Sequence, residues 1–372
     1  MNWSVAPSVQ RRPEWLSPWK DSSLYIARDS KLSSQIVKKI SLNLALPPPR
    51  PQASQTSFGL VGYAKAGPGG FGETTGGQGG KIFDVTNDKE LQRAIKDKSS
   101  EKKIIYIHGT VALSKRFNIP SDTSVIGTGS GGILTSHGIN VKNVTNVIIQ
   151  NLKISRILDN DGITIQNATR VWIDHNEFES DCCTGGPDVY DGQIDVVRAT
   201  DFVTISWNYF HDHWKSSLVG NKDSLRQVDD GHLRVTYHHN YWKNEATRGP
   251  AGRFGHQHIF NNLYEDFLYQ AIHSRSDNQV LVEANVFRGK CTEALSTYGL
   301  VIPMDSPNTS PEGDEEIDGF ANLGAENDFG SCKVNITKEG HFTSVPYQYS
   351  LTPLSEVEQA VRQGAGIGKL EI

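Results

Sequence analysis

The sequence lacks a long apolar run, and it lacks an excess of basic residues. A helix that crosses a membrane needs about 20 predominantly apolar residues in succession, and no such run occurs among the 372 residues. Lysine and arginine together number 37 against 42 acidic residues, which gives a formal charge of −5. Domains that bind nucleic acid are usually basic. We therefore expect neither a membrane nor a nucleic acid as a partner.

Methionine and cysteine are also scarce, whereas glycine is abundant. Two methionines and 35 glycines favour a β protein with many turns. The cysteines do not have the spacing of a zinc site; they are Cys182, Cys183, Cys291 and Cys332. Because adjacent cysteines bridge each other only with strain, we expect a disulfide between Cys291 and Cys332.

No secretory signal is visible at Met1, since the best apolar segment, Ile40–Leu46, is short and lies far from it. Residues 1–57 contain a proline-rich run and no sustained apolar periodicity. We expect them to be a disordered or weakly helical extension outside a domain of residues 58–372. Sequons that are compatible with secretion nevertheless occur at Asn2, Asn143, Asn167, Asn308 and Asn335.

Regular structure is predicted after this extension. The segment Asn87–Lys96 begins with a capping residue and carries apolar residues at helical spacing, which predicts a short helix. The segment Ile104–Ile107 predicts a short strand.

A short pattern then recurs along the chain: alternating apolar residues, an asparagine and, two positions later, a residue that is usually large and apolar. The asparagines are spaced 25, 32, 32, 22 and 23 residues apart, at Asn151, Asn176, Asn208, Asn240, Asn262 and Asn285. Repeats with periods of about 20–50 residues indicate stacked units, and alternation with period two indicates strands. The pattern therefore predicts a parallel β-helix in which stacked asparagines hydrogen-bond along a ladder.

A second register aligns residues 161–165 (DGITI) with residues 191–196 (DGQIDV) on their apolar pairs. This alignment places Asp195 opposite Thr164. Because Ile194 and Val196 would point inward, the pleat directs Asp195 outward.

Four aspartates gather in this region, at Asp159, Asp161, Asp191 and Asp195. Any one of them could be an ordinary solvated loop residue. As a set, however, they place paired carboxylates on the same outer face of two neighbouring coils, where like charges repel unless a cation joins them. Oxygen ligands alone select Ca²⁺. A pair of carboxylates that act as acid and base in glycoside hydrolysis is the main alternative.

Three basic residues follow strands on the adjacent coils. Lys215 lies in HDHWKSSLVG, and Arg248 and Arg253 lie in RGPAGRFG. A lone cation after a strand is usually a surface charge, but arginine suits bidentate recognition of a carboxylate. A row of carboxylates that faces lysine and arginine would form a groove for an anionic polymer bridged by calcium.

Histidines and tryptophans also occur near the repeats. Metal binding or general-base catalysis is possible for the histidines, but we interpret them as stacked core or coil-edge residues; they are His175, His213, His238 and His239. Trp172 and Trp207 lie within the predicted strands, and we expect them to pack rather than to serve as platforms for sugars.

Taken together, VWIDH (171–175), DGQID (191–195), VTISWNYFHDHWKSSLVG (203–220) and VTYHHN…RGPAGRFG (235–255) resemble the polysaccharide lyase family that contains pectate and pectin lyases. The similarity extends from GYA at residue 62 to AGIGKL at residue 365. It implies an all-β fold, a right-handed single-stranded parallel β-helix with short flanking helices. It also implies a secreted, monomeric enzyme that acts on polygalacturonate (pectate) of the plant cell wall.

The resemblance also implies a role for each candidate residue. The calcium ligands would be Asp159, Asp161, Asp191 and Asp195, with Ca²⁺ as the cofactor. Lys215 matches a substrate-binding lysine, Arg248 matches the catalytic base, and Arg253 matches an arginine that binds a substrate carboxylate. Pectin lyases of this family lack the acidic set, so its presence favours pectate, cleaved by β-elimination to unsaturated oligogalacturonides.

Three alternatives stay open. A pectin lyase would act on methylated substrate. A polygalacturonase-like hydrolase would keep its activity in a chelator. A non-catalytic β-helix that binds the cell wall would tolerate the loss of Arg248.

Overall fold

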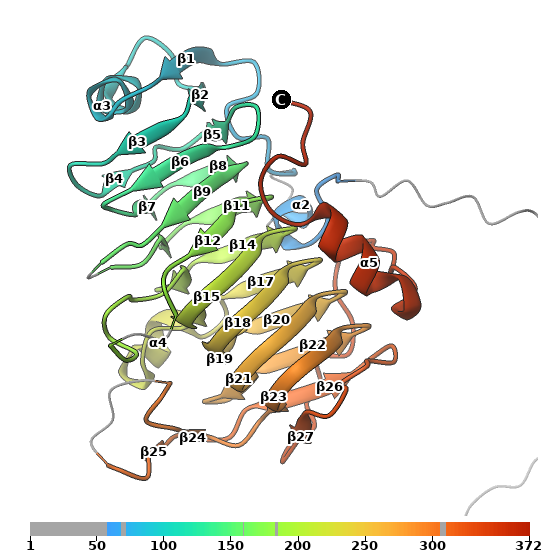
Figure 1. The fold of residues 1–372 in the computed structure, drawn as a ribbon. Coiled ribbons are helices and arrows are strands. Elements are labelled where there is room, and N and C mark those ends of the chain that lie inside the picture. Colours follow the sequence, from blue (N-terminus) through green and yellow to red (C-terminus); the bar gives the residue numbers. More distant parts are fainter. Residues whose placement is uncertain (1–57, 68–71, 159, 183–184, 306–309) are drawn as a thin grey trace, which may run out of the picture. The chain divides into compact units, whose positions relative to one another are not determined.

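The computed structural model describes residues 58–67, 72–158, 160–182, 185–305 and 310–372. The expected extension, residues 1–57, lies outside the described residues. The described chain winds into successive coils whose strands stack in parallel, as Figure 1 shows. No helix among the described residues combines the length and the apolar character that crossing a membrane requires. The predicted right-handed parallel β-helix is confirmed.

The strands form three faces. The first face is a ten-stranded sheet of β1 (Lys81–Val85), β2 (Lys103–Ile107), β5 (Thr123–Gly127), β8 (Thr145–Gln150), β11 (Thr169–Asp174), β14 (Asp201–Ser206), β17 (Arg234–His238), β20 (His256–Phe260), β22 (Gln279–Glu283) and β26 (Phe320–Leu323).

The second and third faces belong to one fifteen-stranded sheet that turns back at its longest strand, β21. The second face holds β3 (Thr110–Ala112), β6 (Gly132–Thr135), β9 (Leu152–Ser155), β12 (Glu177–Glu179), β15 (Tyr209–Lys215), β18 (Tyr241–Thr247), β21 (Leu263–Arg275), β23 (Val286–Ser296) and β27 (Lys333–Asn335). The third face holds β4 (Phe117–Asn118), β7 (Ile139–Lys142), β10 (Ile163–Gln166), β13 (Ile194–Val197), β16 (Ser217–Val219) and β19 (Ala251–Arg253).

Short elements flank the coils. The helices are α2 (Tyr63–Ala66), α3 (Asp88–Lys96), α4 (Arg226–Asp229), α5 (Leu354–Gly364) and the 3₁₀ turn η1 (Asp223–Leu225), and the strands β24 (Leu300–Val301) and β25 (Asp314–Glu315) pair antiparallel. The predicted helix is confirmed as α3, whose capping residue Asn87 accepts a hydrogen bond from the Glu90 backbone N–H. The predicted disulfide between Cys291 and Cys332 is present.

The core lies between the three faces and follows from the period-two pattern. Strands β11 and β14 pair in register, so that Val171 stacks on Val203 and Ile173 on Ile205. All four side chains are fully buried. Because every coil repeats this pairing, apolar residues of successive coils form continuous columns inside the helix.

The predicted asparagine ladder is present, with one error at its start. Asn176, Asn208, Asn240 and Asn262 each donate from Nδ2 to Oδ1 of the next asparagine at 3.0–3.1 Å. The prediction that Asn151 is the first member of the ladder is wrong. The coil is 24 residues long here, so Leu152 occupies the ladder position, and its backbone N–H donates to Asn176 Oδ1.

The ladder continues beyond the predicted repeats. Asn285 Nδ2 donates to Asn327 Oδ1 across a 42-residue coil. The large residues two positions after the asparagines stack as well: Phe210 lies 4.0 Å from Trp242 between ring centroids, and Tyr264 lies 4.3 Å from Phe287. Both columns fix the relative position of successive coils.

We expect Asn208→Ala to lower the free energy of unfolding by about 3 kcal/mol. The variant would remove the side-chain partners of the Ile173 carbonyl oxygen and of the Asn176 backbone N–H, and each buried group left unpaired costs about 1–3 kcal/mol. Urea unfolding measures the change. Asn118→Ala, which removes exposed contacts with the Lys142 backbone, is the control and should have little effect. Equal stabilities of the two variants would contradict a structural role for the ladder.

Candidate active site

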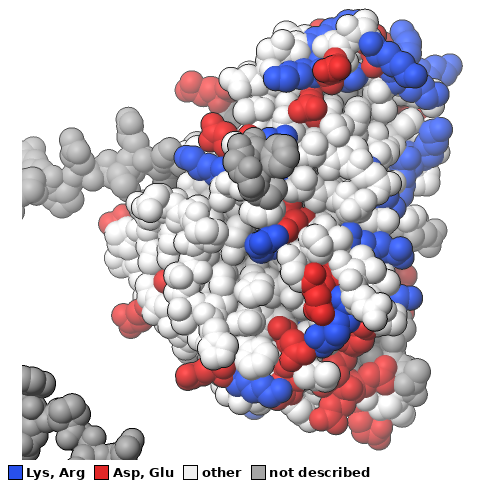
Figure 2. Space-filling model, turned by 180° about the vertical axis from the view of Figure 1, so that it is seen from behind, with Lys and Arg blue, Asp and Glu red and all other residues white. Residues whose placement is uncertain are grey.

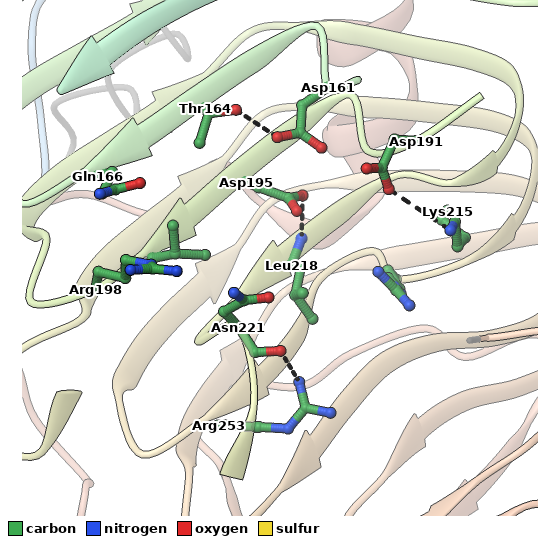
Figure 3. Close-up of a pocket in the computed structure, with 12 residues that line it drawn as sticks. Asp161, Thr164, Gln166, Asp191, Asp195, Arg198, Lys215, Leu218, Asn221 and Arg253 are labelled. Carbon is green, nitrogen blue, oxygen red and sulfur yellow. Dashed lines mark hydrogen bonds and ion pairs between the residues drawn. The ribbon is translucent and has the colours of Figure 1, made fainter. Parts of the chain in front are cut away.

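One cavity of about 300 Å³ opens on the third face, and Figure 3 shows the side chains that line it. Every predicted site residue that the structure describes lies at this cavity: Asp161, Asp191, Asp195, Lys215, Arg248 and Arg253. Asp159 lies outside the described residues. Residues from coils far apart in the sequence are therefore brought to one place.

The parallel register explains this convergence. In the pairing of β10 with β13, Thr164 lies opposite Asp195, as predicted. Asp161 and Asp191 lie shortly before these two strands, Lys215 ends β15 just before β16, and Arg253 ends β19. Successive coils therefore contribute residues to one stretch of the outer surface of the third face.

The carboxylates of Asp161 and Asp195 meet above a glycine. A Cβ atom on Gly192 would lie 2.3 Å from Asp195 Oδ1 and 3.2 Å from Asp161 Oδ1, so only glycine leaves this space open. The Gly192 backbone N–H donates to Asp161 Oδ1 at 3.2 Å, and the Leu218 backbone N–H donates to Asp195 Oδ1 at 3.1 Å. Thr164 Oγ1 also donates to Asp161.

The three carboxylates repel one another. Burial, followed by the charge of Asp191, raises the pKa of Asp161. Burial, followed by the charges of Asp161 and Asp191, raises the pKa of Asp195 well above its usual value. A site made only of carboxylate oxygens, with an open space between them, fits a hard divalent cation such as Ca²⁺.

Lys215 and Asp191 are held together at the rim. The buried Lys215 Nζ lies 2.9 Å from Asp188 Oδ1 and 3.6 Å from Asp191 Oδ1. His213 Nε2 donates to the Asp191 backbone oxygen at 2.7 Å. Burial lowers the pKa of His213 to about 4, so this imidazole is neutral and positions the loop that carries Asp191.

Arg248 is buried and ion-paired. Its Nε donates to Asp305 Oδ1 at 2.8 Å, and its Nη2 donates to the Asp305 backbone oxygen. Burial alone would lower the pKa of Arg248, but the charges of Asp305 and Asp195 raise it. The guanidinium is therefore cationic in the ligand-free protein.

Arg253 makes more contacts with protein partners than Lys215 or Arg248 does. Its Nε lies 3.0 Å from Glu316 Oε2, and its Nη1 donates to the backbone oxygens of Gly220 and Asn221. A further contact joins Nη2 to Glu316. One of the five N–H groups of the guanidinium therefore remains available to a ligand.

Sequence reasoning missed a fourth cation. Arg198 lies on the loop after β13, is exposed and lines the cavity opposite Lys215 and Arg253, as Figure 3 shows. Among the described residues no side chain pairs with it. A lone arginine outside any motif carries no signal in the sequence, so only the fold identifies it.

Acidic residues outnumber basic residues over the whole chain, 42 to 37. On the face shown in Figure 2, both signs of charge occur and neither covers the face. Attraction of an anionic ligand therefore depends on the cations gathered at the cavity.

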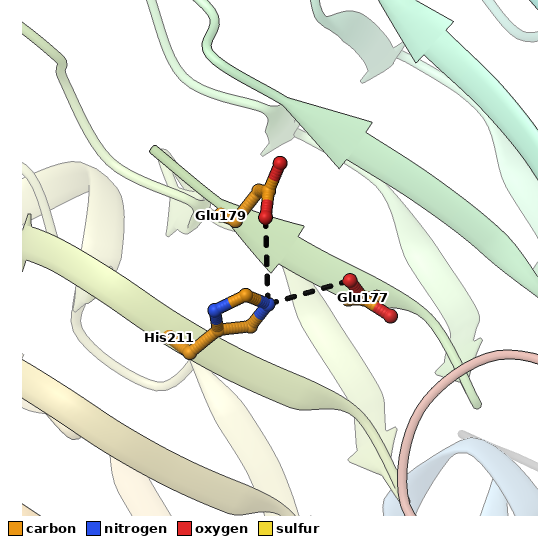
Figure 4. Close-up of side chains that lie close together, drawn as sticks. All are labelled: Glu177, Glu179 and His211. Carbon is orange, nitrogen blue, oxygen red and sulfur yellow. Dashed lines mark hydrogen bonds and ion pairs between the residues drawn. The ribbon is translucent and has the colours of Figure 1, made fainter. Parts of the chain in front are cut away.

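A second group of potential metal ligands lies on the second face, and Figure 4 shows it. Glu177, Glu179 and His211 bring ligand atoms within 4.8 Å of one another. Lys153 Nζ lies 2.7 Å from Glu177 Oε1 and 3.0 Å from Glu179 Oε2. Because an ammonium group already pairs with both carboxylates, we assign no metal to them.

The remaining histidines and the tryptophans pack, as predicted. Trp207 stacks on His239 at 4.3 Å between ring centroids and on His175 at 5.9 Å. His238 stacks on Phe260 at 5.0 Å. Trp172 Nε1 donates to Ser206 Oγ on the neighbouring strand. None of these side chains lines the cavity.

Comparisons with known proteins agree with one another. Residues 49–370 match the family described as Pectate lyase. The chain is 42% identical over 271 residues to probable pectate lyase A of Aspergillus fumigatus, which covers 72% of this chain and 77% of the relative. It is 38% identical over 313 residues to pectate lyase A of Aspergillus niger, which covers 83% and 88%.

A solved structure is similar over the whole β-helix. The pectate lyase Bsp165PelA from Bacillus sp. N165, in complex with trigalacturonate, is 29% identical to the chain. The match has a TM-score of 0.69 and covers 83% of this chain and 99% of that one.

We expect Asp195→Asn to stabilise the calcium-free protein at neutral pH and to abolish its response to calcium. A carboxylate whose pKa is higher in the folded state than in the unfolded state destabilises the fold as pH rises towards that pKa, and the amide removes this charge. Wild-type protein should gain about 2.7 kcal/mol at a calcium concentration 100 times Kd. That gain should diminish as pH falls, because protonated Asp161 and Asp195 bind calcium less well.

Thermal unfolding with a chelator and with calcium measures both effects. Asp84→Asn, which alters an exposed carboxylate on β1, is the control and should respond to calcium like the wild type. A wild-type protein that calcium does not stabilise would contradict the metal site.

Proposed function

The chain belongs to the pectate lyase family, and we propose that it cleaves the (1→4)-α-D-galacturonan chain of pectate by β-elimination with Ca²⁺ as its cofactor. One observation carries the residue assignment: the carboxylates of Asp161, Asp191 and Asp195 share a cavity with Lys215, Arg248 and Arg253. An anionic polymer can bind here only if its carboxylates meet the cations and share a metal ion with the acidic set.

The comparisons support the substrate. The similar Bacillus enzyme was solved with trigalacturonate, which is a short piece of the same polymer. The cation-lined cavity suits a chain that carries one carboxylate per sugar.

Secretion and action as a monomer are further parts of the proposal. The substrate is a cell-wall polymer, and the Cys291–Cys332 disulfide is typical of proteins that work outside the reducing cytosol.

β-Elimination begins with removal of the proton on C5 of a galacturonate. We assign this step to Arg248. Lys215 would bind the carboxylate on the same sugar and stabilise the negative charge that develops there. Arg253 would contact a carboxylate through its remaining N–H group. The C4–O bond then breaks, the glycosidic oxygen leaves with the electron pair, and a C4–C5 double bond remains in the product.

Calcium bound by Asp161, Asp191 and Asp195 would neutralise these carboxylates. By binding the substrate carboxylate as well, it would make the C5 proton more acidic. Arginine is a weak choice of base at neutral pH, because its pKa exceeds about 12. Asp195 and Asp191 are among the charges that raise the pKa of Arg248. We therefore expect the rate to rise towards alkaline pH, where the neutral guanidine is more populated.

The direct test is the ultraviolet absorbance of the unsaturated product. Polygalacturonate should yield this absorbance in the presence of calcium and not in excess chelator, and calcium rather than zinc should restore it. Highly methylated pectin is the comparison substrate and should react more slowly, since methyl esters lack the negative charge that the cations and calcium attract. Cleavage without absorbance would indicate hydrolysis, and full activity in chelator would rule out the calcium requirement.

We expect Arg248→Lys to lower kcat by about 100- to 10,000-fold with little change in KM, because the charge is kept while the geometry of proton removal is lost. Arg234→Lys is a matched control, since Arg234 also pairs with a buried aspartate, Asp201, but lies away from the cavity. Steady-state kinetics of the two variants measure the difference. Near wild-type kcat for Arg248→Lys would refute the assignment of the base.

A further inference from the structure

Asp305, an acidic residue outside the motifs of the sequence analysis, accepts hydrogen bonds from Arg248. Asp305 lies between β24 and β25, 57 residues from Arg248, and is 1% exposed. Its side chain accepts a hydrogen bond from Arg248 Nε at 2.8 Å, and its backbone oxygen accepts one from Nη2. Two contacts from one residue fix both the position and the plane of the guanidinium.

The third nitrogen of the Arg248 guanidinium, Nη1, is available to a ligand in the cavity. Arg248 Nη1 has no hydrogen-bond partner among the described residues, and Arg248 lines the cavity. Asp305 therefore binds one edge of the guanidinium and leaves the remaining nitrogen towards the substrate. A side chain with four rotatable torsions would otherwise sample many directions.

Asp305 is itself held from two sides. Arg275, which is fully buried, donates from Nη1 to Asp305 Oδ2 at 2.7 Å. Trp214 Nε1 donates to the backbone oxygen of Met304 at 2.7 Å, which anchors the loop next to Asp305. Although burial alone would raise the pKa of Asp305, Arg248 and Arg275 hold it below its usual value, so the residue stays ionised.

The same network reaches the second arginine of the cavity. Arg275 Nε lies 3.3 Å from Glu316 Oε2, and Glu316 pairs with Arg253. Negative and positive groups thus alternate behind the cavity in the order Arg248, Asp305, Arg275, Glu316 and Arg253. The segment after β24 therefore supports both arginines that we assign to the reaction.

We propose that Asp305, held by Arg275, is a positioning residue that directs Arg248 Nη1 at the C5 proton of the substrate. This inference rests on the proposed function of Arg248. It predicts an effect on turnover rather than on substrate binding, since Asp305 is buried behind Arg248 and does not line the cavity. A misplacement of the reacting group by about 1 Å can lower the rate by about 100-fold.

The test compares Asp305→Ala, Asp305→Asn and wild-type protein on polygalacturonate with calcium. We expect Asp305→Ala to lower kcat by about 100-fold with KM unchanged. Asparagine has one oxygen and can accept from Arg248 or from Arg275 through its side chain, but not from both through separate oxygens. Asp305→Asn should therefore fall between Asp305→Ala and the wild type. If the alanine variant does not fold, this isosteric variant carries the test.

Asp201→Asn is the matched control, because it also removes a buried carboxylate from an arginine pair, on the first face. We expect the Asp305 variants and Asp201→Asn all to lower the melting temperature, because each breaks a buried ion pair. Only the Asp305 variants should lower kcat. A kcat for the Asp305 variants no lower than that of Asp201→Asn, or a loss that appears mainly in KM, would overturn the inference. An inactive wild-type protein would instead refute the proposed function.

Discussion

Parallel strands of successive coils pair in register along most of the helix, and this constraint determines both the core and the site. Each strand hydrogen-bonds to its neighbour about 4.8 Å away, so equivalent residues of successive coils lie directly above one another. Inside the helix this stacking yields continuous columns such as Val171 on Val203. It also yields the asparagine ladder and the column of aromatic rings, in which each side chain satisfies or packs against the next.

The same constraint forces like charges together on the outer surface. Asp195 lies on the strand next to Thr164, and Asp161 lies just before the strand of Thr164, so the two carboxylates meet over Gly192. An arrangement that is favourable for asparagines, which both donate and accept, is unfavourable for aspartates, which only accept when ionised. The raised pKa values of Asp161 and Asp195 report this repulsion. Because a cation between these carboxylates would offset their repulsion, the stacking produces a binding site for a cation.

Stacking alone does not orient long basic side chains. Lys215, Arg248 and Arg253 each depend on an acidic partner: Asp188, Asp305 and Glu316 respectively. Two of these partners come from the irregular segment after β24, where the short strand β25 pairs with β24 and not with the stacked strands of the coils. The regular part of the fold thus brings the reacting groups to one edge, and the irregular part holds them in place. Arg198, without such a partner among the described residues, remains the cation with most freedom to follow a ligand.

The sequence by itself determined the parallel β-helix, the Thr164–Asp195 register and the residues that meet at the cavity, because these features repeat or lie next to a repeat and their spacing carries the information. It also determined the helix α3, through a capping residue and apolar residues at helical spacing. Asn151 was misplaced because one residue of coil length shifts a side chain out of its column, and sequence spacing alone does not reveal the length of each coil. Only the tertiary structure decided the roles of His213, Arg198, Asp305 and Arg275. Their contacts join residues tens of positions apart through irregular loops, where no period relates one partner to the other.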